Sequence, residues 1–138
     1  MGDEEVPFLG NTEVLVKVNA SSQNYHDLLV VRGLIPTQDN RVPLSDCGGQ
    51  IVATGRLQTR WNIGDNVISC CYSDWVEGKP QTKLLSFIGE HLDGYATEYI
   101  AVEETSLTVA PKGWSALESA TLPCAGLTAW RSLVEEGR

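Results

Sequence analysis

The sequence has no apolar run long enough to cross a bilayer, and positive charge is scarce in it. Lys and Arg number 10 against 18 Asp and Glu, so the formal net charge over 138 residues is −8. A membrane-spanning helix needs about 20 consecutive apolar residues, and no segment approaches that length. The acidic balance disfavours binding to nucleic acid or to an anionic membrane. What remains is an acidic globular protein, whose hydrophobic fraction of 42% suits a folded domain.

The beginning of the chain lacks the features of a targeting segment. Residues 1–5 are Met-Gly-Asp-Glu-Glu, without the basic and apolar regions of a signal peptide. Val6 stands where N-myristoylation requires Ser or Thr. We therefore expect a cytoplasmic protein, in which the four cysteines are free thiols rather than a disulfide framework.

Motifs for phosphate binding, nucleophilic catalysis and metal binding are also missing. There is no G-x-G-x-x-G turn, no P-loop and no G-x-S-x-G elbow. Paired C-x-x-C spacings are absent, and the adjacent Cys70 and Cys71 would point to opposite faces of a strand. His26 and His91 lie far apart, with no ligand partner at helical spacing. We expect two surface histidines and no metal site.

What the sequence does contain is a series of short β patterns separated by turn residues. Residues 13–19 alternate apolar and polar side chains, which is the period of a half-buried strand. Gly33 is a plausible end for a helix that begins at Tyr25, and Ser115 with Glu118 forms a capping-box pattern. Residues 75–88 suggest a surface excursion. We expect a mainly β fold with strands over 13–19, 49–54, 66–72, 94–102 and 106–110, and helices over 25–32, 115–120 and 126–136.

Glycines are concentrated in residues 45–55, Ser-Asp-Cys-Gly-Gly-Gln-Ile-Val-Ala-Thr-Gly, which are followed by Gly64-Asp65. Glycine between β-branched residues marks a tight turn or a close approach of two backbone segments. Near the end, Cys124 lies beside Pro123, where a packed thiol is a better interpretation than a reactive one. These residues alone predict an acidic β domain of unknown role.

The order of these segments resembles the N-terminal, GroES-like domain of the medium-chain dehydrogenases/reductases. Each segment is a weak signal, but together and in order they are specific. The segments are residues 14–18, 24–27 with 32–33, 45–55 with 64–65, 93–99, and 120–130.

The resemblance implies a partly open GroES-like β-barrel with short helices. Its C-terminal helix would lead toward a cofactor-binding Rossmann domain that is absent from these 138 residues. Residues 13–138 would be the catalytic domain. Residues 1–12 would be an acidic segment, standing where the family's first strands are missing.

Zinc enzymes of this family hold the metal with a Cys in the cleft turn, a His in the glycine-rich segment and a later Cys. The corresponding residues here are Asn24, Ser45 and Cys124, of which only Cys124 is a usual zinc ligand. The cysteine-rich lobe that carries structural zinc is also missing. The chain is therefore similar to the zinc-independent, quinone oxidoreductase-like branch, and we expect no zinc.

The resemblance also implies roles for individual residues. Asn24 would lie near the nicotinamide ribose of NAD or NADP, and Thr128 near the nicotinamide ring. Tyr25 and Ser45 would line the cleft, where either hydroxyl could donate a hydrogen bond to the substrate oxygen.

Three further polar residues would have structural roles in this comparison. The carboxylates of Asp27 and Asp46 would accept hydrogen bonds, and Arg32 would form an ion pair with one of these carboxylates.

The activity implied is hydride transfer from NAD(P)H to a small carbonyl or activated alkene, with a possible homodimer in the full-length family. Without the Rossmann domain, this chain alone is expected to bind NAD(P) weakly and to be inactive. Two alternatives stay open at this point. One is a non-enzymatic GroES-like binding or assembly domain, because fold does not determine function. The other is a fragment of a polyketide-type enoyl reductase.

Overall fold

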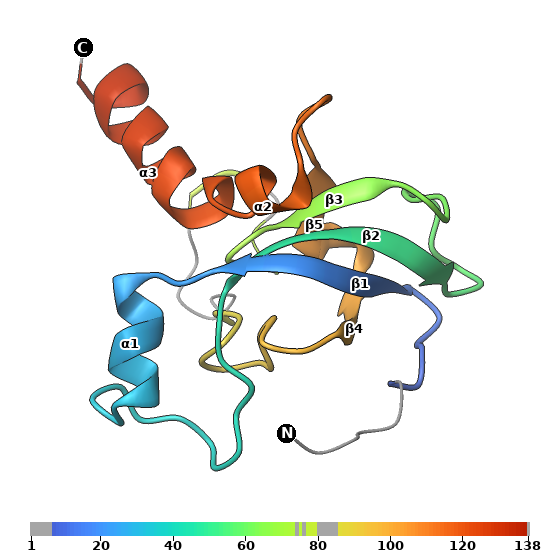
Figure 1. Ribbon diagram of the computed structural model, residues 1–138, viewed down its shortest axis with the longest axis horizontal. Coiled ribbons are helices and arrows are strands. Elements are labelled where there is room, and N and C mark those ends of the chain that lie inside the picture. The colour runs from blue at the N-terminus through green and yellow to red at the C-terminus, as the bar shows by residue number, and fades with distance from the viewer. Residues whose placement is uncertain (1–6, 74, 76, 80–85, 138) are drawn as a thin grey trace.

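The structure is a computed structural model, and it describes residues 7–73, 75, 77–79 and 86–137. Five strands form one antiparallel sheet in the order β4-β1-β2-β3-β5, and the sheet does not close on itself (Figure 1). This confirms the prediction of a mainly β, partly open fold with short helices. The strands are β1 (Glu13–Ser22), β2 (Asp46–Thr54), β3 (Asn66–Ser69), β4 (Tyr99–Glu103) and β5 (Leu107–Val109).

The interior strand β1 has partners on both sides in the sheet. It pairs with β2 on one side and with β4 on the other, and it buries Val14 and Val16 completely. β1 extends three residues beyond the predicted end, because its last residue, Ser22, still pairs with Asp46 of β2. This pairing fixes the start of β2 beside the segment that leads out of β1, where the candidate site lies.

The hydrophobic core lies against this sheet. Apolar side chains from all five strands pack together with residues of the two segments that join β2 to β3 and β3 to β4. Tyr95 and Ile51 are among its largest fully buried side chains. The core consists of Val14, Val16, Cys47, Ile51, Trp61, Val67, Ile88, Tyr95, Ile100, Val102 and Leu107.

Every predicted strand differs from the structure in at least one bound; β2, for example, begins at Asp46 and not at residue 49. Two of the differences are large. The strand expected over 94–102 is only Tyr99–Glu103, because the N–H groups of Gly94 and Tyr95 donate to the carbonyls of Val42 and Leu44 outside the sheet. The strand expected over 66–72 ends at Ser69. The expected excursion over 75–88 lies partly outside the described residues.

Two short helices begin as predicted, each at a capping box. Helix α1 (Tyr25–Val31) has Asn24 as its N-cap and ends before Gly33, and α2 (Ala116–Ser119) follows Ser115. The Glu118 carboxylate accepts the Ser115 N–H at 2.8 Å, while the Ser115 hydroxyl accepts the Glu118 N–H at 3.3 Å. A single turn, η2 (Glu104–Ser106), joins β4 to β5.

The C-terminal helix is less regular than the pattern predicted. It is divided into the π-type turn η3 (Leu122–Gly126), α3 (Leu127–Trp130) and the π-type turn η4 (Arg131–Glu135). α2 and α3 lie on one side of the sheet, and α3 projects away from it (Figure 1). Its predicted apolar face is exposed, with Leu127 at 64% and Trp130 at 60%. Among the described residues, no helix is long and apolar enough to cross a membrane.

Candidate functional site

A buried carboxylate joins three elements that are far apart in the sequence. Asp46, the first residue of β2, is fully buried. Its Oδ2 accepts hydrogen bonds from Asn24 Nδ2 at 3.0 Å and from the Cys124 N–H at 3.3 Å. Ser45 Oγ lies 3.5 Å from Oδ1 of the same carboxylate. Asp46 thereby fixes the beginning of α1 and the turn η3 against the start of β2.

Asn24 owes its position to the local folding of α1. As the N-cap it has extended backbone angles, and its N–H donates to Asp27 Oδ2 at 2.7 Å. This bond satisfies a backbone donor at the helix start and leaves the Asn24 side chain available for Asp46. Asp27 is 2% exposed and accepts this bond instead of pairing with Arg32, which is exposed and has no ion pair in the described part of the chain.

Burial raises the pKa of Asp46 above its ordinary value. The hydrogen bonds from Asn24 and from the Cys124 backbone oppose this rise, whereas the nearby Asp27 carboxylate adds to it. Desolvation is the largest of these effects, because the carboxylate is removed from water without a cation beside it. The centre of the site is therefore a buried acid held by neutral donors.

The thiols around Asp46 are not activated nucleophiles. Burial, with the charge of Asp46 as a smaller cause, raises the pKa of Cys71 to about 12. Burial also raises the pKa of Cys124, although a hydrogen bond with the Cys71 side chain partly opposes the rise. All four cysteines are free. Since the thiolate is the reactive form, these shifts agree with the packed thiols that the sequence predicted.

The structure brings together only part of the predicted site. Asn24, Ser45 and Asp46 share one hydrogen-bonded cluster, and Ser45 is fully buried within it. Tyr25 is 74% exposed and Thr128 is also exposed, so neither belongs to that cluster.

The expectation of two surface histidines was wrong for His26. Its Nε2 is buried and lies 2.9 Å from Glu90 Oε2, while His91 Nε2 lies 3.5 Å from the other carboxylate oxygen. The His26 contact is short, but the ring nitrogen is not aligned for a hydrogen bond to this oxygen. Only the place of His26, two residues after Asn24, could have drawn attention to it, because no local pattern links residue 26 to residue 90.

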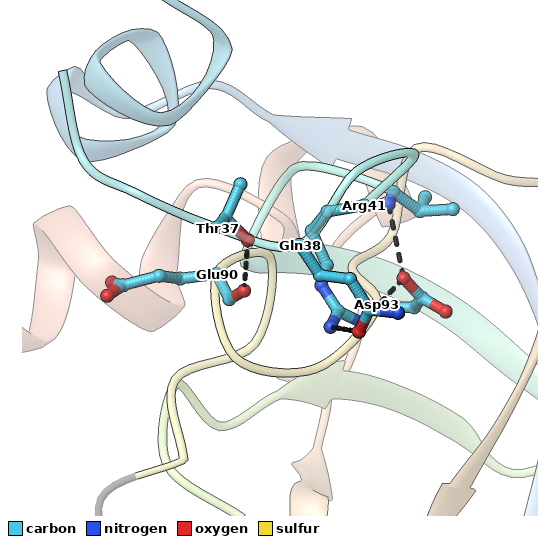
Figure 2. Close-up of polar contacts among 6 residues, drawn as sticks. Thr37, Gln38, Arg41, Glu90 and Asp93 are labelled. Carbon is cyan, nitrogen blue, oxygen red and sulfur yellow. Dashed lines mark hydrogen bonds and ion pairs between the residues drawn. The ribbon is translucent and has the colours of Figure 1, made fainter. Parts of the chain in front are cut away.

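A second set of contacts holds the Glu90 segment in place (Figure 2). Thr37 Oγ1 donates to the Glu90 carbonyl at 2.6 Å, and Asp93 Oδ1 accepts from Arg41 Nη1 at 2.8 Å. Arg41 Nη2 also donates to Gln38 Oε1 at 3.0 Å. The loop after α1 is thereby tied to the segment that carries Glu90 and His91.

The donor set around Asp46 does not fit a zinc ion. Within the ranges that the structure describes, no three His, Cys, Asp or Glu side chains are placed to hold a metal. The Asn24 amide nitrogen already donates to Asp46, and an amide N–H has no lone pair to offer a cation. Ser45 Oγ is likewise not among the usual zinc ligands.

Comparisons with known proteins agree with this architecture. Residues 10–112 match the alcohol dehydrogenase GroES-like domain. A zinc-type alcohol dehydrogenase-like protein of Schizosaccharomyces pombe is 39% identical over 133 residues, which cover 94% of this chain and 38% of that protein. A chloroplastic quinone-oxidoreductase homolog of Spinacia oleracea is 30% identical, covering 94% of this chain and 36% of the relative.

The solved structures show the same domain. A crystal structure of a Sinorhizobium meliloti protein named as an alcohol dehydrogenase superposes with a TM-score of 0.87 at 37% identity, covering 96% of this chain and 40% of the other. The chain thus spans 36–40% of the length of these three proteins. It belongs to the alcohol dehydrogenase GroES-like domain family of the medium-chain dehydrogenases/reductases.

Proposed function

We propose that this chain is the substrate-binding half of an NAD(P)-dependent, zinc-independent oxidoreductase that reduces a carbonyl or an activated alkene. The Asp46 cluster supports the proposal most directly. Where zinc enzymes of the family place a Cys and a His, this chain has Asn24 and Ser45, both turned to a buried carboxylate. Bound NAD(P)H would supply the hydride.

The residues of this chain would then bind and orient the reactants. Asn24, held by Asp46, would lie near the nicotinamide ribose, and Thr128 near the ring. Negative charge that develops on the substrate oxygen must be met by hydrogen-bond donors when no metal is present. Tyr25 is the more accessible candidate, because the Ser45 hydroxyl is buried beside Asp46.

Zinc titration tests the zinc-independent assignment. We expect the purified polypeptide to hold no stoichiometric zinc after dialysis, because Cys124 alone remains of the three ligand positions. The double variant Asn24→Cys, Ser45→His supplies the missing thiolate and imidazole, and it should bind zinc with a measurable Kd. Elemental analysis of both proteins provides the readout. One equivalent of tightly held zinc in the wild type would contradict the assignment.

NADPH titration tests the proposal that residues 1–138 have no cofactor site of their own. We expect residues 1–138 to show no micromolar binding of NADPH, since most cofactor contacts in a doubly wound domain come from its own glycine-rich turn. The measurement is NADPH fluorescence during titration with the polypeptide. Micromolar affinity would show that this half carries a cofactor site of its own.

The reading frame beyond Arg138 tests the enzymatic role itself. A strand followed by a glycine-rich turn would support the oxidoreductase, whereas a natural stop without such a sequence would favour a non-enzymatic binding domain. We propose the cytosol as its compartment because its four cysteines are free thiols.

A further inference from the structure

A hollow lies between the start of β3 and the loop that joins β5 to α2. Its volume is about 400 Å³, which is within the range of small-molecule sites. Asn66, which lines the hollow, pairs with Gln50 of β2. Gln50 comes four positions after Asp46 in the same strand, which is roughly 13 Å along an extended backbone. The hollow is therefore a place in the molecule distinct from the Asp46 cluster.

Backbone hydrogen bonds fix the loop that forms one wall of the hollow. The Ala110 N–H donates to the Asn66 carbonyl at 3.0 Å, and the Trp114 N–H donates to the Pro111 carbonyl at 3.3 Å. Gly113 has a φ of +83°, the left-handed conformation that favours glycine. The loop projects from the sheet between β5 and α2 (Figure 1). Its last residue, Trp114, lines the hollow with a ring that is 50% exposed.

Arg60 lines the same hollow and is held in place by its neighbours. Its guanidinium lies over the ring of Trp61, 5.2 Å from the ring centroid, and its backbone N–H donates to Glu104 Oε2 at 3.2 Å. Trp61 is 5% exposed, and its Nε1 donates to the Glu104 carbonyl at 2.8 Å, so the ring is a rigid support. A stacked guanidinium still has its N–H edge available for a planar carboxylate.

The charged side chains that line the hollow leave a single net positive charge. Arg60 and Lys112 supply two positive charges, and Asp65 removes one of them. Neither cation has an ion pair with a described residue, although the whole chain carries a net charge of −8. Asp65 Oδ2 accepts the Asn62 N–H at 2.8 Å, which holds this carboxylate at the turn before β3. A monoanion matches this balance, whereas a phosphate dianion brings one negative charge too many.

We propose that this hollow binds an aromatic monocarboxylate, with its carboxylate on Arg60 and its ring against Trp114. The guanidinium offers two parallel N–H donors to the carboxylate, and Lys112 adds a second positive charge nearby. The indole offers an apolar face on which a flat ring stacks. The site lies outside the Asp46 cluster, so the inference does not depend on the proposed oxidoreductase function, and the failure of either leaves the other untouched.

The probe for this inference is 1-naphthoate, and isothermal titration calorimetry of the purified protein measures its binding. We expect saturable binding with a submillimolar Kd. Arg60→Gln should weaken it by at least about tenfold, as for loss of a hydrogen bond between charged groups. Trp114→Ala should weaken it by about fivefold, as for loss of an aromatic pair. The matched controls are Arg56→Gln and Trp130→Ala, which remove an arginine and an exposed tryptophan outside the hollow and should leave the Kd unchanged.

Two further ligands test the charge of the site. The neutral 1-naphthamide keeps the ring system and should bind at least about tenfold more weakly than 1-naphthoate. The dianion of 1-naphthyl phosphate should also bind more weakly than 1-naphthoate. Asp65→Asn keeps an oxygen for the Asn62 N–H, and it should strengthen the binding of 1-naphthyl phosphate more than that of 1-naphthoate.

Thermal unfolding of each variant shows whether it is folded. If Arg60→Gln does not fold, Lys112→Gln in the exposed loop replaces it, and we expect its Kd to rise by up to about fivefold, as for an exposed ion pair. Equal affinity of wild type and the folded cation variant, equal affinity for 1-naphthoate and 1-naphthamide, or an unchanged Kd in Trp114→Ala would each overturn the inference. It would also be overturned by the absence of saturable binding, or by tighter binding of 1-naphthyl phosphate to wild type.

Discussion

Replacing Gly48 by alanine is expected to lower the free energy of unfolding by about 3 kcal/mol, the cost of overpacking against a rigid neighbour. A Cβ at this position would overlap the carbonyl oxygen of Ala116 and lie 3.0 Å from its carbonyl carbon. Both atoms belong to the backbone of α2, which cannot rotate away as a side chain can. Thermal unfolding should show a Tm lower by roughly 10 °C.

Gly126→Ala provides the matched control. Its Cβ would come 3.0 Å from Leu122 Cδ2, the flexible end of a side chain. Alanine also favours helix over glycine by about 1 kcal/mol. We expect its Tm to be equal to wild type or slightly higher. An equal loss in both variants would show that the close approach of β2 to α2 does not set the cost.

The second large effect is expected at Asp46. Asp46→Ala should cost about 2–3 kcal/mol at pH 7, because it leaves the Asn24 amide and the Cys124 N–H without an acceptor in a buried place. Asp46→Asn keeps an oxygen for both donors and can place its new amide toward Ser45 Oγ. We expect that variant to be at least as stable as wild type at pH 7. Denaturant titration of the three proteins measures the difference.

The pH dependence of these proteins separates charge from hydrogen bonding. Because burial raises the pKa of Asp46, the folded protein binds this proton more tightly than the unfolded chain. The group therefore adds stability below its unfolded pKa of about 3.8, and this contribution is lost as the pH rises through the folded value. Wild type should lose stability relative to Asp46→Asn across that window. Parallel curves for the two would contradict a desolvated Asp46.

The sequence predicts much of this fold because its signals are local. Alternation marks β1, and the Asn24 and Ser115 caps mark the starts of α1 and α2. The prediction of a strand from residue 94 was wrong, because the N–H groups of Gly94 and Tyr95 donate to carbonyls of the loop before β2. That partnership spans about fifty residues, and no periodicity within either segment encodes it.

The candidate site is likewise predicted in part from local motifs and in part hidden in long-range contacts. Family motifs point to Asn24 and Ser45, yet the pairing of both with Asp46 depends on how β1 and β2 align. The Glu90 partnership with His26 is still harder to foresee, because each residue alone is typical of a solvated surface. Both sets of contacts become visible only when the tertiary structure is known.

The pairing of β1 with strands on both of its sides has a consequence for the order of folding during synthesis. Glu13 pairs with Glu103, so one side of β1 waits for residues that are synthesised some ninety positions later. Closing so long a loop is entropically costly, and such non-local pairing slows folding. Until β4 is made, an early pair of β1 and β2 must present an unpaired edge. This interval is when the nascent chain most needs protection from pairing with its neighbours.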